Sequence, residues 1–261
     1  MNLLQQMVAA QQQQRPYALL TVVRVCGHVP RGVGSKMLVF ADGATCGSIG
    51  GNLSERQAVE DARACIAQGT HDLRTYDLHA QEGQQNAQIT VFIEVSRFAP
   101  VLVVCGGGHV GAQVLALGRN LGFETVLVDD RDREAIAPAL QQADRFFSVT
   151  DYRTGVQQLP IAAGAYFVLC SWGHAQDQEA LFGALHKDAA YIGMLGGKPK
   201  IRQIFAALRE QGISQQALDT VCTPVGLDLG AQTPAEVALS ILAEILLVRN
   251  GAGGARMSQR E

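Results

Sequence analysis

The sequence has 261 residues, of which 48% are hydrophobic and 17% charged, and its formal net charge at pH 7 is −3. This composition excludes a disordered chain, because it supplies enough apolar side chains to bury a core, and the length allows one large domain or two ordinary ones. The weakly acidic balance gives no support to nucleic acid or an anionic membrane surface as a partner, so we expect neither.

The six cysteines stand at positions 26, 46, 65, 105, 170 and 222, and no pair has CxxC spacing. This pattern does not predict a zinc or iron–sulfur site, so we assign no metal ligand, and isolated thiols are typical of a reducing compartment. Residues 1–14 lack the features of a secretion signal, and no apolar run is long enough to span a bilayer. We therefore expect a soluble, cytoplasmic protein.

The first 98 residues predict a small α+β domain. Apolar periodicity predicts helices over 3–10 and 53–67, the second capped by Asn52 or Ser54. Strands are expected at 18–25, 36–40, 46–49, 73–78 and 88–95, with a hairpin turn at Asp42-Gly43 and a polar stretch at 81–87. Phe98-Ala99-Pro100 is the expected linker, because proline interrupts regular structure.

From residue 99 the pattern changes to short apolar strands that alternate with helices. The expected strands are 101–105, 125–129, 145–149, 166–170 and 190–194. The expected helices are 110–121, 133–142, 177–186, 199–211 and 234–249. Strands without polar alternation are typical of a parallel sheet covered on both faces. The predicted fold class is therefore α/β, with a Rossmann-type parallel sheet over 99–250, the smaller α+β domain before it and a mobile tail at 251–261.

A glycine-rich turn joins the first strand of this second domain to its helix. It reads Gly106-Gly107-Gly108-His109-Val110-Gly111, which has GxGxxG spacing. The first glycine of such a turn allows a sharp reversal, the second lets the backbone approach a pyrophosphate, and the third lets helix and strand pack closely. We expect these six residues, the phosphate turn, to bind a phosphate-bearing, nucleotide-like ligand at the helix start. The alternative is a turn that binds nothing.

Three charged residues at the end of the next predicted strand complete this candidate site. Asp129 and Asp130 lie near the spacing at which a ribose-binding acid is expected. Arg131 adjoins them and is a candidate for a ligand phosphate, with a solvated arginine as the alternative.

Two polar residues follow the predicted strand 166–170. Because open α/β sheets bind ligands at the carboxyl ends of their strands, His174 and Asp177 are candidate site residues. The alternative is that Asp177 caps a helix and His174 lies exposed in a loop. No nucleophile or metal-binding spacing accompanies them, so no catalytic residue is assigned.

Two further segments are candidates for ligand contact. Gly193 and Gly196 belong to a second glycine-rich turn, where Lys198 or Lys200 is available to an anion or simply solvated. Asp228, among small residues before the last helix, is either a turn former or a polar contact at the mouth of the cleft.

Several longer motifs run through both halves of the chain. They are Pro30-Arg31, Gly34–Met37, Asp42-Gly43, Gly47–Gly51, Glu55, the phosphate turn, Val128–Arg131, His174 with Asp177, Tyr191–Gly196, Gly226–Gly230, Thr233-Pro234, Glu236 and Ser240–Glu244. Together they resemble the XdhC/CoxI family, accessory proteins of molybdenum hydroxylases such as xanthine dehydrogenase. Two positions depart from the family pattern: Trp172 replaces a frequent histidine, and Asn52 replaces a cysteine of some members.

This resemblance implies a chaperone that binds molybdenum cofactor, as molybdopterin or its nucleotide form, supports its sulfuration and delivers it to the apo-hydroxylase. It also implies a homodimer and contact with a cysteine desulfurase. The phosphate turn and the two acids leave open a second hypothesis, an NAD(P)-dependent oxidoreductase that uses the same site.

Overall fold

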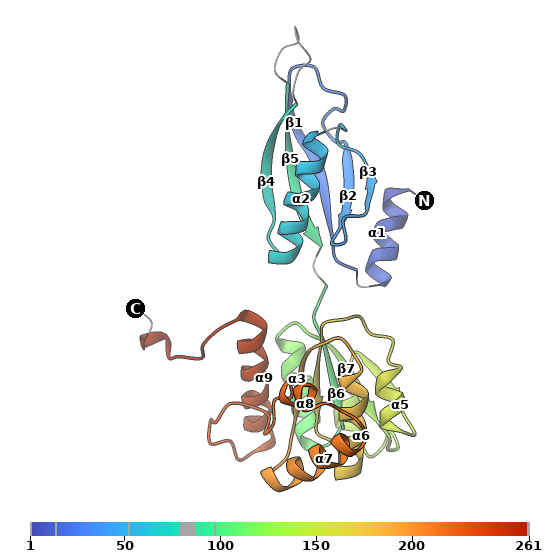
Figure 1. Cartoon of the computed structure of the whole chain (residues 1–261), viewed down its shortest axis with the longest axis vertical. Coiled ribbons are helices and arrows are strands. Elements are labelled where there is room, and N and C mark those ends of the chain that lie inside the picture. The colour runs from blue at the N-terminus through green and yellow to red at the C-terminus, as the bar shows by residue number, and fades with distance from the viewer. Residues whose placement is uncertain (1, 14, 52, 79–86, 97, 260–261) are drawn as a thin grey trace. The chain divides into compact units, whose positions relative to one another are not determined.

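The computed structural model describes residues 2–13, 15–51, 53–78, 87–96 and 98–259. The chain forms two compact units, Met1–Phe98 and Ala99–Glu261, and each is described by itself (Figure 1). None of the helices within these ranges has both the length and the apolar character that a membrane crossing requires.

The first unit is an antiparallel sheet with a helix packed on each face (Figure 1). Its strands, in the spatial order β3-β2-β1-β5-β4, are β1 (Tyr17–Cys26), β2 (Lys36–Phe40), β3 (Thr45–Gly47), β4 (Asp72–Leu78) and β5 (Ala87–Ser96). The helices are α1 (Leu3–Gln12), whose N-cap is Asn2, and α2 (Leu53–Gln68).

The apolar run in β2 explains why both faces of this sheet are covered. Met37 and Val39 pack into the cluster beneath α2, whereas Leu38 and Phe40 pack into the cluster beneath α1. Successive strand residues point to opposite faces, so a run without polar alternation requires apolar cover on both sides. Gly43, with a φ of +86°, makes the turn from β2 to β3 that the sequence predicts.

The second unit is a five-stranded parallel sheet in the order β10-β9-β6-β7-β8. Its strands are β6 (Val101–Cys105), β7 (Glu124–Asp129), β8 (Arg145–Ser148), β9 (Ala165–Leu169) and β10 (Ala189–Met194). Its α-helices are α3 (His109–Asn120), α4 (Ala137–Leu140), α5 (Tyr152–Gln157), α6 (His174–Leu185), α7 (Lys198–Glu210), α8 (Gln215–Asp219) and α9 (Pro234–Asn250), and a short 3-10 turn follows at Met257–Gln259. The strand order reverses between β6 and β9, so the carboxyl ends of these two strands mark the switch point of a Rossmann sheet.

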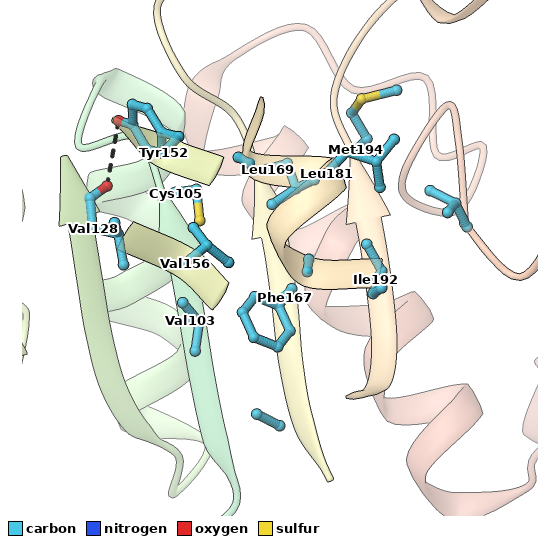
Figure 2. Close-up of a cluster of buried hydrophobic side chains, with 14 of the residues drawn as sticks. Val103, Cys105, Val128, Tyr152, Val156, Phe167, Leu169, Leu181, Ile192 and Met194 are labelled. Atoms are coloured by element: carbon cyan, nitrogen blue, oxygen red, sulfur yellow. Dashed lines mark hydrogen bonds between the residues drawn. The ribbon is translucent and has the colours of Figure 1, made fainter. Parts of the chain in front are cut away.

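Helices cover both faces of the parallel sheet. Figure 2 shows Val103 and Cys105 of β6 on the face that packs against Tyr152 and Val156 of α5, together with α6 and α7. The intervening residues of β6 pack on the other face, against α3, α4 and α9. Each fully buried valine or leucine contributes about 1.5–3 kcal/mol, which fixes the strands and therefore the positions of their carboxyl ends.

A short segment after α8 covers the outer edge of β10. Cys222 donates its backbone N–H to Ile192 O at 2.9 Å, and Met194 donates its own to Cys222 O at 3.0 Å. The edge strand of the sheet therefore has backbone partners on this side.

The predicted strands and most helices of both units are present, with shifts of one to three residues at their ends. The helix predicted over 133–142 is wrong in length, because α4 spans only Ala137–Leu140. Pro138 has no N–H, so it cannot continue a helix that begins upstream, and residues 132–136 form turns instead. The predicted caps of α2 and residues 81–86 of the polar stretch lie outside the described side chains and residues.

Two other differences concern the carboxyl edge of the sheet and short helices. Helix α6 begins at His174 with Gly173 as its N-cap, so the alternative that Asp177 caps this helix from a loop is wrong. Helices α5 and α8 were not predicted, because five or six residues are too few for a clear apolar period.

Candidate functional site

Three helices begin at the carboxyl edge of the parallel sheet without side-chain caps. Their N-caps are glycines in extended conformation: Gly108 before α3, Gly173 before α6 and Gly197 before α7. The helices α5, α8 and α9 instead have side-chain caps from Asp151, Ser214 and Thr233. The first N–H groups of a helix have no intrahelical acceptor, so this edge of the sheet presents donors and positive dipole ends to an anion.

The glycines of the phosphate turn have different surroundings. Gly106 has a φ of +114°, and a Cβ there would lie 2.5 Å from Cys170 O. A Cβ on Gly111 would lie 1.9 Å from Gly106 O, whereas a Cβ on Gly108 would meet nothing within 4 Å. Gly106 and Gly111 are therefore required by the backbone itself, and Gly108 borders open space.

The remaining residues of the phosphate turn are spread between surface and core. His109, the first residue of α3, is exposed, and Val110 is half-buried against the cluster beneath α3. A Cβ on Gly107 would lie 3.0 Å from Ala139 Cβ, so this glycine faces α4 rather than open space.

Asp129 is bonded on both oxygens by protein donors. Its Oδ2 accepts the backbone N–H of Gly107 at 2.6 Å and Arg131 Nη2 at 2.7 Å. Its Oδ1 accepts the backbone N–H and the Nε of Arg131, each at 2.9 Å. Burial raises the pKa of Asp129, but the hydrogen bonds from Arg131 and Gly107 outweigh it, so its pKa lies below the ordinary value. The carboxylate therefore stays ionised and ties the phosphate turn to the end of β7.

Asp130 takes part in a different contact. Its Oδ1 accepts the indole N–H of Trp172 at 2.9 Å, and the Trp172 side chain is 61% exposed. Trp172 follows β9, so the structure brings together loops that follow β7 and β9 on either side of the phosphate turn.

Asp177 is the second fully buried acid at this edge. Its Oδ1 accepts Ser171 N at 2.8 Å and Ser171 Oγ at 2.6 Å, and its Oδ2 forms an ion pair with Lys200. Lys200 also donates to Leu195 O at 3.1 Å and is 16% exposed. The lysine that the sequence offered to a ligand anion is thus engaged with Asp177, and the pair fastens the first turn of α6 to α7. His174, the first residue of α6, is exposed.

The second glycine-rich turn packs against protein. A Cβ on Gly193 would lie 2.5 Å from Val225 Cγ2 and 2.6 Å from Tyr191 OH, and one on Gly196 would lie 2.8 Å from Lys200 Cδ. Packing alone therefore accounts for a glycine at each position.

Asp228 lies exposed in a loop that α9 holds in place. Glu244 Oε2 accepts the backbone N–H of Gly226 at 2.9 Å and the hydroxyl of Tyr191 at 2.5 Å. The backbone N–H of Leu227 donates to Ser240 O at 3.2 Å. The structure does not place Asp228 in contact with the phosphate turn, so it brings together only part of the candidate set.

Two buried thiols lie beside the phosphate turn. Cys105 ends β6, and Cys170 lies 3.5 Å from Gly106 O through its Sγ. Burial raises the pKa of both thiols above the ordinary value. Within the described parts of the chain, no group of three or more His, Cys, Asp or Glu side chains is placed to hold a metal ion.

In the first unit, Glu55 Oε1 accepts the backbone N–H of Ile49 at 2.9 Å, which braces the turn before α2. Arg31 is exposed in its loop. These two motif residues are therefore, respectively, a structural brace and a surface cation within their own unit.

Sequence reasoning missed the contacts of Ser171 and Trp172 at the site, and of Glu244 behind it. All three follow a strand or lie on the last helix, as a site of this fold requires, but their types gave no signal of a partner. The ion pair of Asp177 with Lys200 joins the starts of two helices, and no local spacing indicates it.

Comparisons with known proteins place the chain in a family. Residues 102–245 match the XdhC Rossmann domain, and residues 10–77 match the XdhC and CoxI family. The chain is 30% identical over 267 residues to the uncharacterized protein YqeB of Escherichia coli (strain K12), covering 98% of this chain and 48% of that protein. It is 24% identical over 161 residues to a probable xanthine dehydrogenase component of Bacillus subtilis (strain 168), covering 61% of this chain and 46% of that protein. The chain thus spans about half the length of these curated relatives.

A crystal structure of a xanthine dehydrogenase from Bacillus halodurans has the same fold. The TM-score is 0.51 with 18% identity, covering 100% of this chain and 98% of that one. Because the XdhC Rossmann domain matches residues 102–245 and the XdhC and CoxI family matches residues 10–77, the chain belongs to the XdhC family.

Proposed function

We propose that this chain is an accessory chaperone that binds molybdenum cofactor, supports its sulfuration and delivers it to a molybdenum hydroxylase such as xanthine dehydrogenase. Two findings support the proposal: membership of the XdhC family and the open space at Gly108 in the phosphate turn. The cofactor is a pterin with a dithiolene and a terminal phosphate, and it supplies the molybdenum chemistry of the target hydroxylase.

The terminal phosphate fits what Gly108 offers. Gly108 is the N-cap of a 12-residue helix, has no side-chain cap, and has nothing within 4 Å of where a Cβ would lie. Helix N–H groups without acceptors, together with the helix dipole, favour an anion at such a position. Arg131 adds a cation beside the same turn, because it and Gly107 donate to the same oxygen of Asp129. These residues would hold the phosphate, in either the molybdopterin or the nucleotide form of the cofactor.

The pterin ring has a candidate partner in Trp172. Its indole is 61% exposed and is held by the hydrogen bond to Asp130. A flat heterocycle stacks favourably on an aromatic side chain, with a typical contribution of about 1–3 kcal/mol. We assign Trp172 this role in the proposal.

We propose that the sulfur comes from a separate cysteine desulfurase. Sulfur transfer needs a reactive thiolate, whereas Cys105 and Cys170 beside the phosphate turn are buried and have raised pKa values. The proposal further includes a homodimer that acts in the cytoplasm, as the family resemblance implies.

The proposal is tested on protein purified under reducing conditions, by mass spectrometry of the ligand released on denaturation. We expect a pterin phosphate or its nucleotide form with the natural chain and none with Gly108→Asp. Aspartate is a favourable N-cap, so this variant keeps α3 while it places a negative charge where the phosphate would bind. Gly32→Asp is the matched control, because Gly32 also has nothing within 4 Å of its Cβ position and lies in the other unit.

Equal amounts of cofactor from Gly108→Asp and Gly32→Asp would contradict the proposed binding site. Delivery is measured as the hydroxylase activity that an apo-hydroxylase gains after incubation with cofactor-loaded protein. No gain over free cofactor would remove the chaperone role.

An NAD(P)-dependent oxidoreductase remains the second candidate. The observation that favours it is the GxGxxG turn on β6 with an acid, Asp129, at the end of β7. Titration with NADH and NADPH, followed by a search for hydride transfer, distinguishes it: tight binding with turnover would favour the enzyme over the chaperone.

A further inference from the structure

The acid that would bind a ribose in a Rossmann domain is fully engaged within this protein. Asp129 has no solvent exposure, and its carboxylate accepts from four donors, namely Gly107 N and the N, Nε and Nη2 atoms of Arg131. A carboxylate has about four lone-pair sites, so this set fills its accepting capacity. A ribose diol would have to displace one of these donors.

Such a displacement is unfavourable. Arg131 is fixed to Asp129 by two N–H groups from one side of its guanidinium, and charge-assisted pairs of this kind are the strongest hydrogen bonds in proteins. Removal of Gly107 N–H from the carboxylate would change the phosphate turn itself. The neighbouring acid, Asp130, is engaged by Trp172 through its Oδ1.

A cation occupies the place where a diol would otherwise be bound. Arg131 is 27% exposed, and its Nη1 makes no hydrogen bond to any residue that the structure describes. Arg131 Nη2 and Gly107 N share one acceptor oxygen, so the guanidinium lies directly beside the phosphate turn. The N–H groups of Nη1 are therefore available to a second anionic group of a ligand bound at that turn.

We propose that Arg131 is the specificity residue of the candidate site, that Asp129 is its positioning residue, and that together they select a phosphoryl group over a ribose diol. The inference rests on the proposed function only in using the same phosphate turn. It names the ligand class: a molecule with a phosphoryl group near the end of β7, rather than a dinucleotide whose ribose hydroxyls are read by an acid.

Two commercially available dinucleotides test this selection in the full chain. NADP⁺ differs from NAD⁺ by one phosphate on the adenosine ribose, so the ratio of their dissociation constants isolates the response to that phosphate. We expect NADP⁺ to bind about tenfold or more tightly than NAD⁺, and inorganic pyrophosphate to compete with it, because one charge-assisted contact is worth about one decade of affinity.

Two variants connect the preference to the pair. Arg131→Ala is expected to abolish the ratio, and Asp129→Asn to reduce it without strengthening NAD⁺ binding. Arg133→Ala is the matched control, because Arg133 is an exposed cation two residues away whose guanidinium lies over Phe146. The ratio is the informative measurement, because a general loss of stability lowers both affinities together.

Equal binding of the two dinucleotides, no binding of NADP⁺ or pyrophosphate at millimolar concentration, or an unchanged ratio in Arg131→Ala would overturn the inference. The proposed function fails separately. If the purified chain carries no molybdenum cofactor yet shows the Arg131-dependent ratio, the chaperone proposal falls and this inference stands. If Arg131→Ala carries as much cofactor as the natural chain and shows the same ratio, this inference falls and the chaperone proposal stands.

Discussion

Trp172 donates its indole N–H to Asp130 at 2.9 Å, although the two residues follow strands β9 and β7, which β6 separates. Neighbouring strands lie about 4.8 Å apart, so the bond reaches across the carboxyl end of β6, where the phosphate turn begins. Trp172 is the single tryptophan of the sequence. Its fluorescence therefore reports on the candidate site alone.

We expect Asp130→Ala to release the indole and shift the Trp172 emission to longer wavelength, because the ring gains contact with water. Pyrophosphate should change the emission of the natural chain, since a charge at the start of α3 alters the field at the ring. Asp132→Ala is the control, because Asp132 is an exposed acid nearby. An identical emission spectrum in Asp130→Ala and the natural chain would show that the hydrogen bond does not hold the indole in solution.

Two glycines of the phosphate turn should respond oppositely to the same change. Gly111→Ala places a methyl group 1.9 Å from Gly106 O, so helix and strand must separate. We expect a loss of about 3 kcal/mol or more in the free energy of unfolding. Gly108→Ala meets nothing within 4 Å at a φ of −72°, and its effect on stability should stay within about 0.5 kcal/mol. Urea unfolding followed by Trp172 emission measures both, and similar losses in the two variants would contradict this division of roles.

Lys200→Met should destabilise the second unit by about 3–5 kcal/mol, because it leaves the fully buried Asp177 without its counter-ion. Lys198→Met, on the same first turn of α7, changes an exposed side chain and should alter stability little. The double variant Asp177→Asn with Lys200→Met should recover part of the loss, since no charge is then left buried. Equal urea midpoints for Lys200→Met and Lys198→Met would mean that the ion pair contributes no net stability.

The pH dependence of stability should reveal Asp129. Its pKa in the folded protein is lowered, since the hydrogen bonds from Arg131 and Gly107 outweigh the effect of burial, and its value in the unfolded chain is about 3.9. Asp129 therefore contributes stability that is fully present above about pH 4 and is lost as the pH falls through the folded pKa. Asp129→Asn lacks this titration, so the gap in unfolding free energy between the two proteins should narrow below about pH 4. Other carboxylates titrate in both proteins, and a gap that stays constant down to about pH 3 would contradict the assignment.

The thiols beside the phosphate turn should resist alkylation in the folded protein. Cys105 and Cys170 are buried with raised pKa values, whereas Cys26 is exposed. Iodoacetamide reacts with the thiolate, so at about pH 8 we expect Cys26 to be modified first and the two buried thiols only after unfolding. Peptide mass spectrometry gives the order. Rapid native labelling of Cys105 would reopen a role for that thiol in sulfur transfer.

The sequence predicts the parallel sheet well because its strands carry their own signal. Runs such as 101–105 and 165–169 contain almost no polar residue, and only burial on both faces accommodates such runs. The phosphate turn is likewise legible, because its glycines follow a strand and precede a helix. Helix α5 was missed although Asp151 caps it, since six residues do not establish a period.

The site itself depends on side-chain partners that no spacing encodes. Asp129 has the spacing of a ribose-binding acid, but whether it is available depends on the guanidinium two residues later folding back onto it. Lys200 likewise resembles a free cation until the start of α7 is placed beside Asp177. The residue types are visible in the sequence, whereas their pairings arise only when the strands bring separate loops to one edge.

The pairing of Cys222 with β10 also matters for solubility at high concentration. An outermost strand with unpaired N–H and C=O groups is a template on which another chain can add a strand and begin to aggregate. Here Ile192 and Met194 already bond to the backbone of Cys222, so that side of the sheet has no vacant row to offer at this point. Because the cover comes from the same chain, protection against strand addition arises as soon as the second unit folds, before any partner binds.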